Sequence, residues 1–188
     1  MQNCCIISYV KKSLFFLVLL FLFAASGQKV LAQAISTSPA ALNVQYNLPY
    51  TGILPDNPLY FLKALRDNFL NIFITDPIQK ANYDLLMADK RVGAASALID
   101  KGEVDLAITT LSKSGNYFYL AVQQAASAKK QGENTGEILT KLLAASLKHQ
   151  QVIFQMEEKT KGDARLVLQV SQKRAEDLQK SVEQLKYK

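Results

Sequence analysis

Apolar residues recur three and four positions apart along almost the whole chain after residue 57, and this spacing constrains the fold more than any other feature. One run shows it without interruption: Ile78, Ala81, Leu85, Ala88, Val92, Ala95 and Ile99. Because an α-helix turns once in about 3.6 residues, this spacing places the apolar side chains on one helical face. No segment has the alternation or the β-branched density of a strand, so the sequence predicts an all-α fold.

Short signals mark the ends of five predicted helices. Asn57-Pro58 and Asp76-Pro77 each join a capping side chain to a proline that suits the first helical turn. The candidate caps of the last two helices are Asn134 or Thr135 and Asp163, and the glycines that end the second, third and fourth helices are Gly102, Gly132 and Gly162. Short connections favour antiparallel neighbours, and a helix of about 24 residues spans about 36 Å. We therefore expect an elongated antiparallel bundle or array of four to five long helices.

Three of these helices carry more particular expectations. The first has an aromatic-rich apolar face, which we expect to lie in the core: Phe61, Leu62, Leu65, Phe69, Ile72 and Phe73. Gly115 interrupts the third stripe, and we expect a neighbour to approach closely there rather than the helix to break. The fifth stripe is weak around Ser171 and Ala175. This last helix is therefore expected to extend past the bundle or to pair with another helix, including a second copy of itself.

The first 32 residues have the pattern of an export signal. Lys11 and Lys12 precede an unbroken apolar run from Leu14 to Ala25, and Val30-Leu31-Ala32 offers a cleavage site. We expect residues 1–32 to be a signal peptide and the protein to be secreted or extracytoplasmic, in the cell envelope. The alternative is an uncleaved N-terminal helix that anchors the protein and makes its only membrane contact. Residues 33–56 are expected to form an extended linker or flexible arm, and residues 57–188 the helical domain.

Cleavage would change both the cysteine content and the charge. Cys4 and Cys5, the two cysteines of the chain, lie before the apolar run, so the mature protein would have no disulfide. Three lysines and no acidic residue would leave with the signal peptide, which lowers the formal charge from +6 to about +3. A dense basic run and a recognition motif are both missing, so nucleic acid is not an expected partner.

The stretch LPDNPLYFLK resembles the opening signature of the bacterial family called domain of unknown function 5667. Its members share Leu-Pro-Asp-Ser-Pro-Leu-Tyr, and Asn57 replaces the serine here. The residues that carry this structural signature are Leu54, Pro55, Asp56, Asn57, Pro58, Leu59, Tyr60, Asp76, Pro77 and Gly102. The resemblance covers residues 52–125 and leaves 134–188 as a helical extension. It implies an exported or membrane-attached helical protein and carries no activity.

The signature itself has two interpretations. In the first, Leu54 and Leu59 pack over the entry to the first helix, while Tyr60 keeps its hydroxyl near water. In the second, the stretch is a docking epitope for a partner. We expect the packing role, because a capped helix that starts at a proline needs these residue types for folding alone.

No group of residues predicts catalysis, a cofactor or a metal site. His149 follows Ser146 by one turn, but no orienting acid or nucleophile turn accompanies them, so we expect a partly buried, hydrogen-bonded histidine. The acids around Gly102, namely Asp100, Glu103 and Asp105, lack EF-hand spacing and suit helix capping. Glu157 and Glu158 are expected on a solvated face. At least one residue among Tyr117, Phe118 and Tyr119 should be exposed, since three consecutive helical residues cannot share one core face.

We therefore expect a non-catalytic module for protein interaction or structure, with an unidentified protein or envelope component as partner. A possible alternative is a binder of anionic lipids or wall polymers through surface cations, namely Lys129, Lys130, Lys173, Arg174, Lys180, Lys186 and Lys188. A small-ligand carrier or an enzyme is the third alternative, and it requires a polar pocket that converges on His149.

Overall fold

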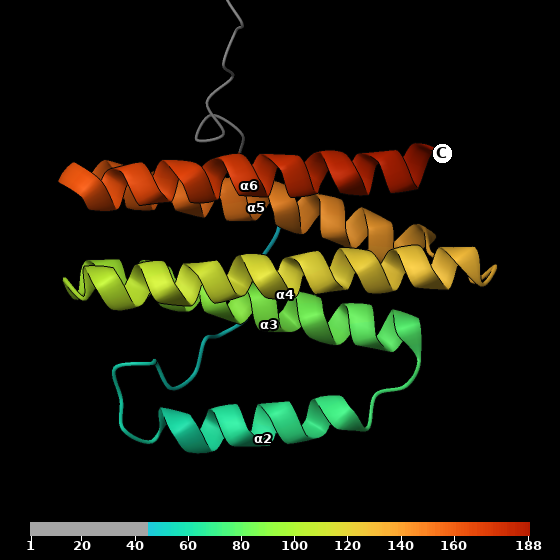
Figure 1. Cartoon of the computed structure of the whole chain (residues 1–188), viewed down its shortest axis with the longest axis horizontal. Coiled ribbons are helices and arrows are strands. Elements are labelled where there is room, and N and C mark those ends of the chain that lie inside the picture. The colour runs from blue at the N-terminus through green and yellow to red at the C-terminus, as the bar shows by residue number, and fades with distance from the viewer. Residues whose placement is uncertain (1–44) are drawn as a thin grey trace, which may run out of the picture. The chain divides into compact units, whose positions relative to one another are not determined.

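The computed structural model describes residues 45–188, and within this range it contains five α-helices and no β-strand (Figure 1). The helices are α2 (Tyr60–Ile72), α3 (Pro77–Asp100), α4 (Val104–Lys130), α5 (Gly136–Lys159) and α6 (Gly162–Tyr187). The all-α prediction is confirmed. The expected signal peptide and the first part of the arm lie outside the described residues.

Helices α3 to α6 form an antiparallel four-helix bundle. The α3–α4 pair has the most extensive contact, α5 packs on α6, and the two pairs meet through α3 with α5 and α4 with α6. Alanines on α3 and α4 are fully buried, among them Ala81, Ala88, Ala121 and Ala125. Small side chains let two helix backbones approach closely, which explains the tight α3–α4 pairing. Larger side chains such as Leu142, Met156 and Leu168 fill the remaining core.

The helix ends follow two of the sequence signals closely. Asp76 caps α3 by accepting a hydrogen bond of 2.6 Å from the backbone amide of Gln79, and Pro77 is the first helical residue. Gly102 has φ of +82°, and the amide of Glu103 donates to the carbonyl of Leu98 at 2.9 Å. This is the left-handed glycine termination expected after α3.

Other helix starts differ from the expectation. Asn57 accepts from the amide of Leu59 at 2.8 Å, but α2 begins only at Tyr60, and Leu59 at its N-cap has no side-chain cap. The prediction that Asp163 caps the last helix is wrong. Helix α6 already begins at Gly162, so Asp163 lies in the first turn, where a carboxylate complements the helix dipole.

Gly115 has the role that we expected from its position. Helix α4 runs through it unbroken, and a Cβ atom at this site would lie 3.2 Å from Nη1 of Arg174 on α6. The missing side chain therefore gives the guanidinium room to lie across α4.

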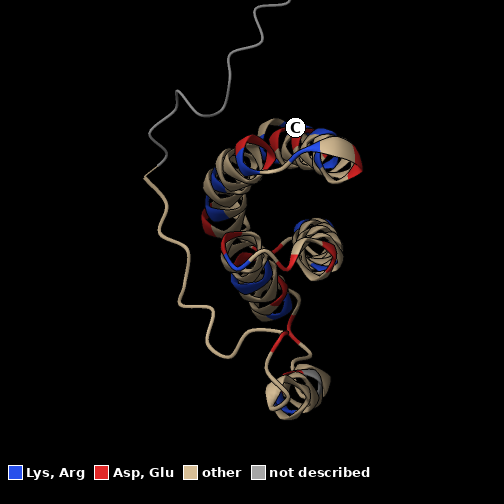
Figure 2. Ribbon diagram, turned by 90° about the vertical axis from the view of Figure 1, so that its left-hand side faces the viewer, with Lys and Arg blue, Asp and Glu red and all other residues tan. Residues whose placement is uncertain are grey.

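The expectation that the apolar face of α2 lies in the core is wrong. The six side chains are 52% to 74% exposed, with Leu62 the least and Ile72 the most exposed. Figure 2 views the helices end-on and shows α2 outside the group formed by the other four. The bundle is complete without α2, so its apolar face has no core to enter.

The described part of the arm, from residue 45 onward, is extended but is not free of the bundle. Tyr46 and Leu48 pack against the two clusters of buried core residues. A Cβ atom on Gly93 of α3 would lie only 2.8 Å from Cγ2 of Thr51, so the glycine makes room for the arm. These residues therefore contact the bundle, and the flexibility expected of the arm stays a prediction.

Candidate functional site

Helix α2 has its polar side toward the bundle and its apolar side toward solvent. Asp67 is only 6% exposed, and its backbone carbonyl accepts a hydrogen bond from the Tyr83 hydroxyl on α3. Phe61, Leu65 and Phe69 lie on the other side and are each at least 60% exposed. Exposed apolar patches of this kind mark interaction surfaces in folded proteins. We call the surface formed by Phe61, Leu62, Leu65, Phe69, Ile72 and Phe73 the α2 apolar face.

A cationic groove runs beside the α2 apolar face. Lys63, Arg66 and Lys90 line it together with apolar side chains, namely Tyr50, Ile53, Leu59 and Leu62. Lys63 donates to the carbonyl of Thr51 at 2.6 Å. Burial lowers the pKa of Lys63. Asp67 opposes this shift, while the nearby cations Lys90, Arg91 and Arg66 add to it. Asp67, the acid on α2, already pairs with Arg66 at 2.7 Å. The groove therefore has a surplus of positive charge.

A second candidate site surrounds His149 inside the bundle. Its Nε2 lies 2.7 Å from Oδ1 of Asp89 on α3, and the Tyr46 hydroxyl donates to Oδ2 of the same carboxylate at 2.6 Å. His149 and Asp89 are 5% and 3% exposed. Burial first, and the bond to Asp89 second, raise the pKa of Tyr46. The expectation of a hydrogen-bonded histidine is confirmed, and its partner is a residue that the sequence analysis missed.

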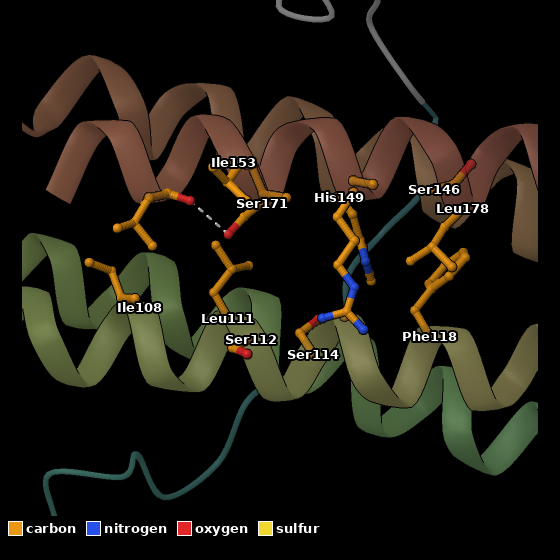
Figure 3. Close-up of a pocket in the computed structure, with 15 residues that line it drawn as sticks. Ile108, Leu111, Ser112, Ser114, Phe118, Ser146, His149, Ile153, Ser171 and Leu178 are labelled. Atoms are coloured by element: carbon orange, nitrogen blue, oxygen red, sulfur yellow. Dashed lines mark hydrogen bonds between the residues drawn. The ribbon is translucent and has the colours of Figure 1, made fainter. Parts of the chain in front are cut away.

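His149 also lines a cavity of about 280 Å³ between α4, α5 and α6. Figure 3 shows the side chains of these helices pointing toward one another across it. Its walls are mainly apolar, with Leu111, Phe118, Ile153 and Leu178 among them, while Ser114, Ser146 and Arg174 add polar groups. The Ser146 hydroxyl donates to the Leu143 carbonyl at 2.8 Å. Within residues 45–188 no hydrogen bond joins it to His149, so the structure does not pair them as nucleophile and base.

Two further acids are buried in the bundle. Asp84 on α3 is 1% exposed, and its Oδ1 has no hydrogen-bond partner among the described residues. Burial raises its pKa to about 6. Glu157 is 7% exposed, and burial likewise raises its pKa. The expectation of a solvated Glu157 is therefore wrong, whereas Glu158 is exposed.

The signature residues lie apart from the cavity. Asp56 pairs with Lys101 at 2.6 Å, which ties the stretch before α2 to the turn after α3. The Asn57 amide donates to the Leu54 carbonyl at 3.1 Å and closes a turn. Leu59 is 55% exposed, so the prediction that it packs over the helix entry is wrong. Leu54 and Tyr60 are half-buried.

The remaining candidates do not form a common site. Asp100 pairs with Lys159 at 2.6 Å, and no group of three His, Cys, Asp or Glu residues in the described range could hold a metal ion. Phe118 is buried, Tyr117 stacks on Arg91 at 4.1 Å, and Tyr119 is 48% exposed, as the spacing argument expected. Lys173 and Lys180 both pair with Asp177 on α6.

The family called Domain of unknown function (DUF5667) matches residues 52–185, which is more than half of the chain. The chain belongs to this family. The DUF5667 match confirms the resemblance carried by Leu54 to Lys63 and continues past residue 125, so it includes α5 and most of α6. No curated protein and no solved structure matches the chain. Over the described part of this DUF5667 protein, no helix has both the length and the apolarity needed to cross a membrane.

Proposed function

We propose that this DUF5667 protein is an exported, non-catalytic module that docks on anionic phospholipid at the bacterial cell envelope through α2. The observation that carries the proposal is the outward direction of the α2 apolar face. From the sequence we expected membrane contact through an uncleaved N-terminal segment or, as an alternative, lipid binding through surface lysines. Here the contact is assigned to α2 instead.

The size and composition of the α2 apolar face support a lipid surface as the partner. Six large side chains, three of them phenylalanines, are at least half exposed on a helix of 13 residues and its C-cap, Phe73. Burial stabilises by about 25 cal/mol for each Å² of apolar area, so several exposed aromatic and aliphatic side chains give useful affinity. An amphipathic helix of this kind lies in the plane of the interface, with its apolar side in the acyl boundary.

The charges beside the helix support an anionic headgroup. Lys63, Arg66 and Lys90 line the groove next to Leu59 and Leu62, so cations and apolar side chains share one surface. Each Lys or Arg near an anionic membrane contributes about 1 kcal/mol. A protein partner or a second copy would need matching acids at this rim. An anionic bilayer supplies negative charge at every position.

The test is co-sedimentation of the purified chain without residues 1–32 with vesicles of equimolar phosphatidylglycerol and phosphatidylcholine, so that the apolar run Leu14 to Ala25 cannot itself bind lipid. Two variants are compared, Leu65→Ser with Phe69→Ser on α2, and Tyr119→Ser with Leu120→Ser on α4. The control pair is also exposed, at 48% and 42%, but neither residue lines the cationic groove. We expect the α2 variant to lose binding by at least about tenfold and the control variant to keep it.

Salt and lipid charge complete the test. Binding should weaken at high salt and on vesicles of phosphatidylcholine alone, since screening and loss of lipid charge remove the electrostatic part. Equal losses in the two variants would contradict the proposal. A second result would also contradict it: light scattering shows a dimer that the α2 substitutions convert to a monomer, and the parent does not bind vesicles. A second copy of the chain would then cover the α2 apolar face.

A further inference from the structure

We propose that the cavity between α4, α5 and α6 binds a small monocarboxylic acid with an apolar body, such as a medium-chain fatty acid. This site is separate from α2, and the inference does not depend on the proposed lipid docking.

Three polar side chains around the cavity are buried in the bundle. His149, Ser114 and Ser146 are at most 5% exposed, and all three line the cavity. Asp89 fixes the imidazole by its contact with Nε2, while Tyr46 holds the other oxygen of that carboxylate. A packing defect between apolar helices would be lined by apolar atoms alone. This cavity combines an apolar wall with a few oriented polar groups, as ligand sites do.

The charge around the cavity selects an anion. Among the lining residues there is no Asp, Glu or Lys, and Arg174 has the permanent charge. The guanidinium donates to Oδ1 of Asn116 at 2.9 Å but forms no ion pair with any described residue. Arg174 is exposed to solvent, and its guanidinium lies across Gly115, where a Cβ atom would be 3.2 Å from Nη1. The guanidinium keeps further N–H donors beside the one that Asn116 accepts, and a charged donor of this kind favours a carboxylate over a neutral head group.

The volume sets the size of the apolar body. At about 280 Å³ the cavity is nearly twice as large as the roughly 150 Å³ apolar cavity that holds benzene. An acyl chain of about eight to ten carbons therefore fits without opening the bundle. Its methylenes would lie against Leu111, Phe118 and Ile153, with the carboxylate toward Arg174.

Isothermal titration calorimetry with decanoate and decanol, both below their aggregation concentrations, tests the inference on the full-length chain. We expect decanoate to bind at least about tenfold more tightly than decanol. Arg174→Gln should abolish this preference, because the amide keeps a polar group but removes the charge. Arg165→Gln, on the same helix but outside the cavity lining, is the matched control and should leave the preference unchanged.

A second variant tests the volume. Ser171→Phe places a ring in the cavity from α6 and should abolish binding of both ligands, while circular dichroism verifies that the variant is folded. Decanoate binding should survive the Leu65→Ser and Phe69→Ser substitutions, which separates this site from lipid docking. Equal affinity for decanoate and decanol would overturn the inference. The inference would also be overturned if Arg174→Gln still bound decanoate more tightly than decanol, or if a folded Ser171→Phe variant still bound either ligand.

Discussion

Helix α2 and the four helices of the bundle have the same three-four spacing of apolar residues but opposite burial. Leu142 on α5 is 0% exposed, whereas Phe69 on α2 is 60% exposed. Asp67, on the polar side of α2, is more buried than any of the six residues of its apolar face. The spacing determines which side chains share a helical face. What that face contacts depends on whether the core still has room for it. The four helices α3 to α6 already bury their apolar faces against one another, so the core has no place for α2.

The largest expected effect is on the free energy of unfolding, when one apolar side chain is truncated in the bundle and one on α2. Leu142→Ala should lower the free energy of unfolding by about 3 kcal/mol, because it removes buried methyl groups and leaves a cavity. Phe69→Ala should change the same quantity by less than about 0.5 kcal/mol, since its ring is already in water. Urea titration of both variants gives the two values. Similar losses would mean that α2 also packs its apolar face inside the protein.

The second prediction concerns the bundle alone and tests the buried carboxylate of Asp84. Its pKa is 3.8 in the unfolded chain and about 6 in the folded protein, so the folded state prefers the protonated form. Stability should therefore fall as the pH rises from about 4 to 6 and then stay lower. Asp84→Asn should raise the free energy of unfolding by up to about 3 kcal/mol relative to the parent at pH 8, with little difference at pH 3. A gain of equal size at both pH values would exclude this titration as the cause.

The arm provides a third comparison, between its anchored and its exposed tyrosine. Tyr46→Phe removes a hydrogen bond to the buried carboxylate of Asp89 and should lower the free energy of unfolding by about 1.5 kcal/mol. Tyr50 is 86% exposed, so Tyr50→Phe is the control and should have no measurable effect. Thermal unfolding followed by circular dichroism measures both. If Tyr46→Phe is as neutral as the control, the arm does not stabilise the bundle.

The smallest expected effect concerns the glycines at helix ends. Gly102→Ala should lower the free energy of unfolding by about 1 kcal/mol, since an L side chain is strained at φ of +82°. Gly136 opens α5 without a positive φ, so Gly136→Ala should be neutral or slightly stabilising. Chemical denaturation of the pair measures the difference, and equal effects would contradict the conformational explanation.

Local signals predicted the bundle well because they act over a few residues. The Asp76-Pro77 start, the Gly102 termination and the close approach at Gly115 follow from capping, backbone freedom and the absence of a Cβ atom. The three-four spacing also indicated the core faces of α3, α4 and α5. None of these signals depends on how distant segments meet.

The sites depend on distant segments, and the sequence indicated them poorly. Asp89 and His149 are separated by 60 positions, and nothing local pairs them. A weaker signal was present, since Asp89 lies four residues after Leu85 and three before Val92, on the edge of the α3 stripe. Asp84 lies three residues after Ala81 and four before Ala88, so it is also at stripe spacing. An acid at stripe spacing is an indication of a buried carboxylate that periodicity analysis of apolar residues alone misses.

The most direct test of the outward α2 apolar face uses single-cysteine variants on a background with Cys4 and Cys5 replaced by serine. An environment-sensitive fluorophore is attached at Leu65→Cys on α2 or at Tyr119→Cys on α4, and each emission spectrum is recorded with and without anionic vesicles. The account predicts solvent-like emission from both labels in buffer, and a blue shift on vesicles only for the α2 label. A Leu65→Cys label that is already in an apolar environment in buffer, or that shifts no more than the α4 label on vesicles, would contradict it.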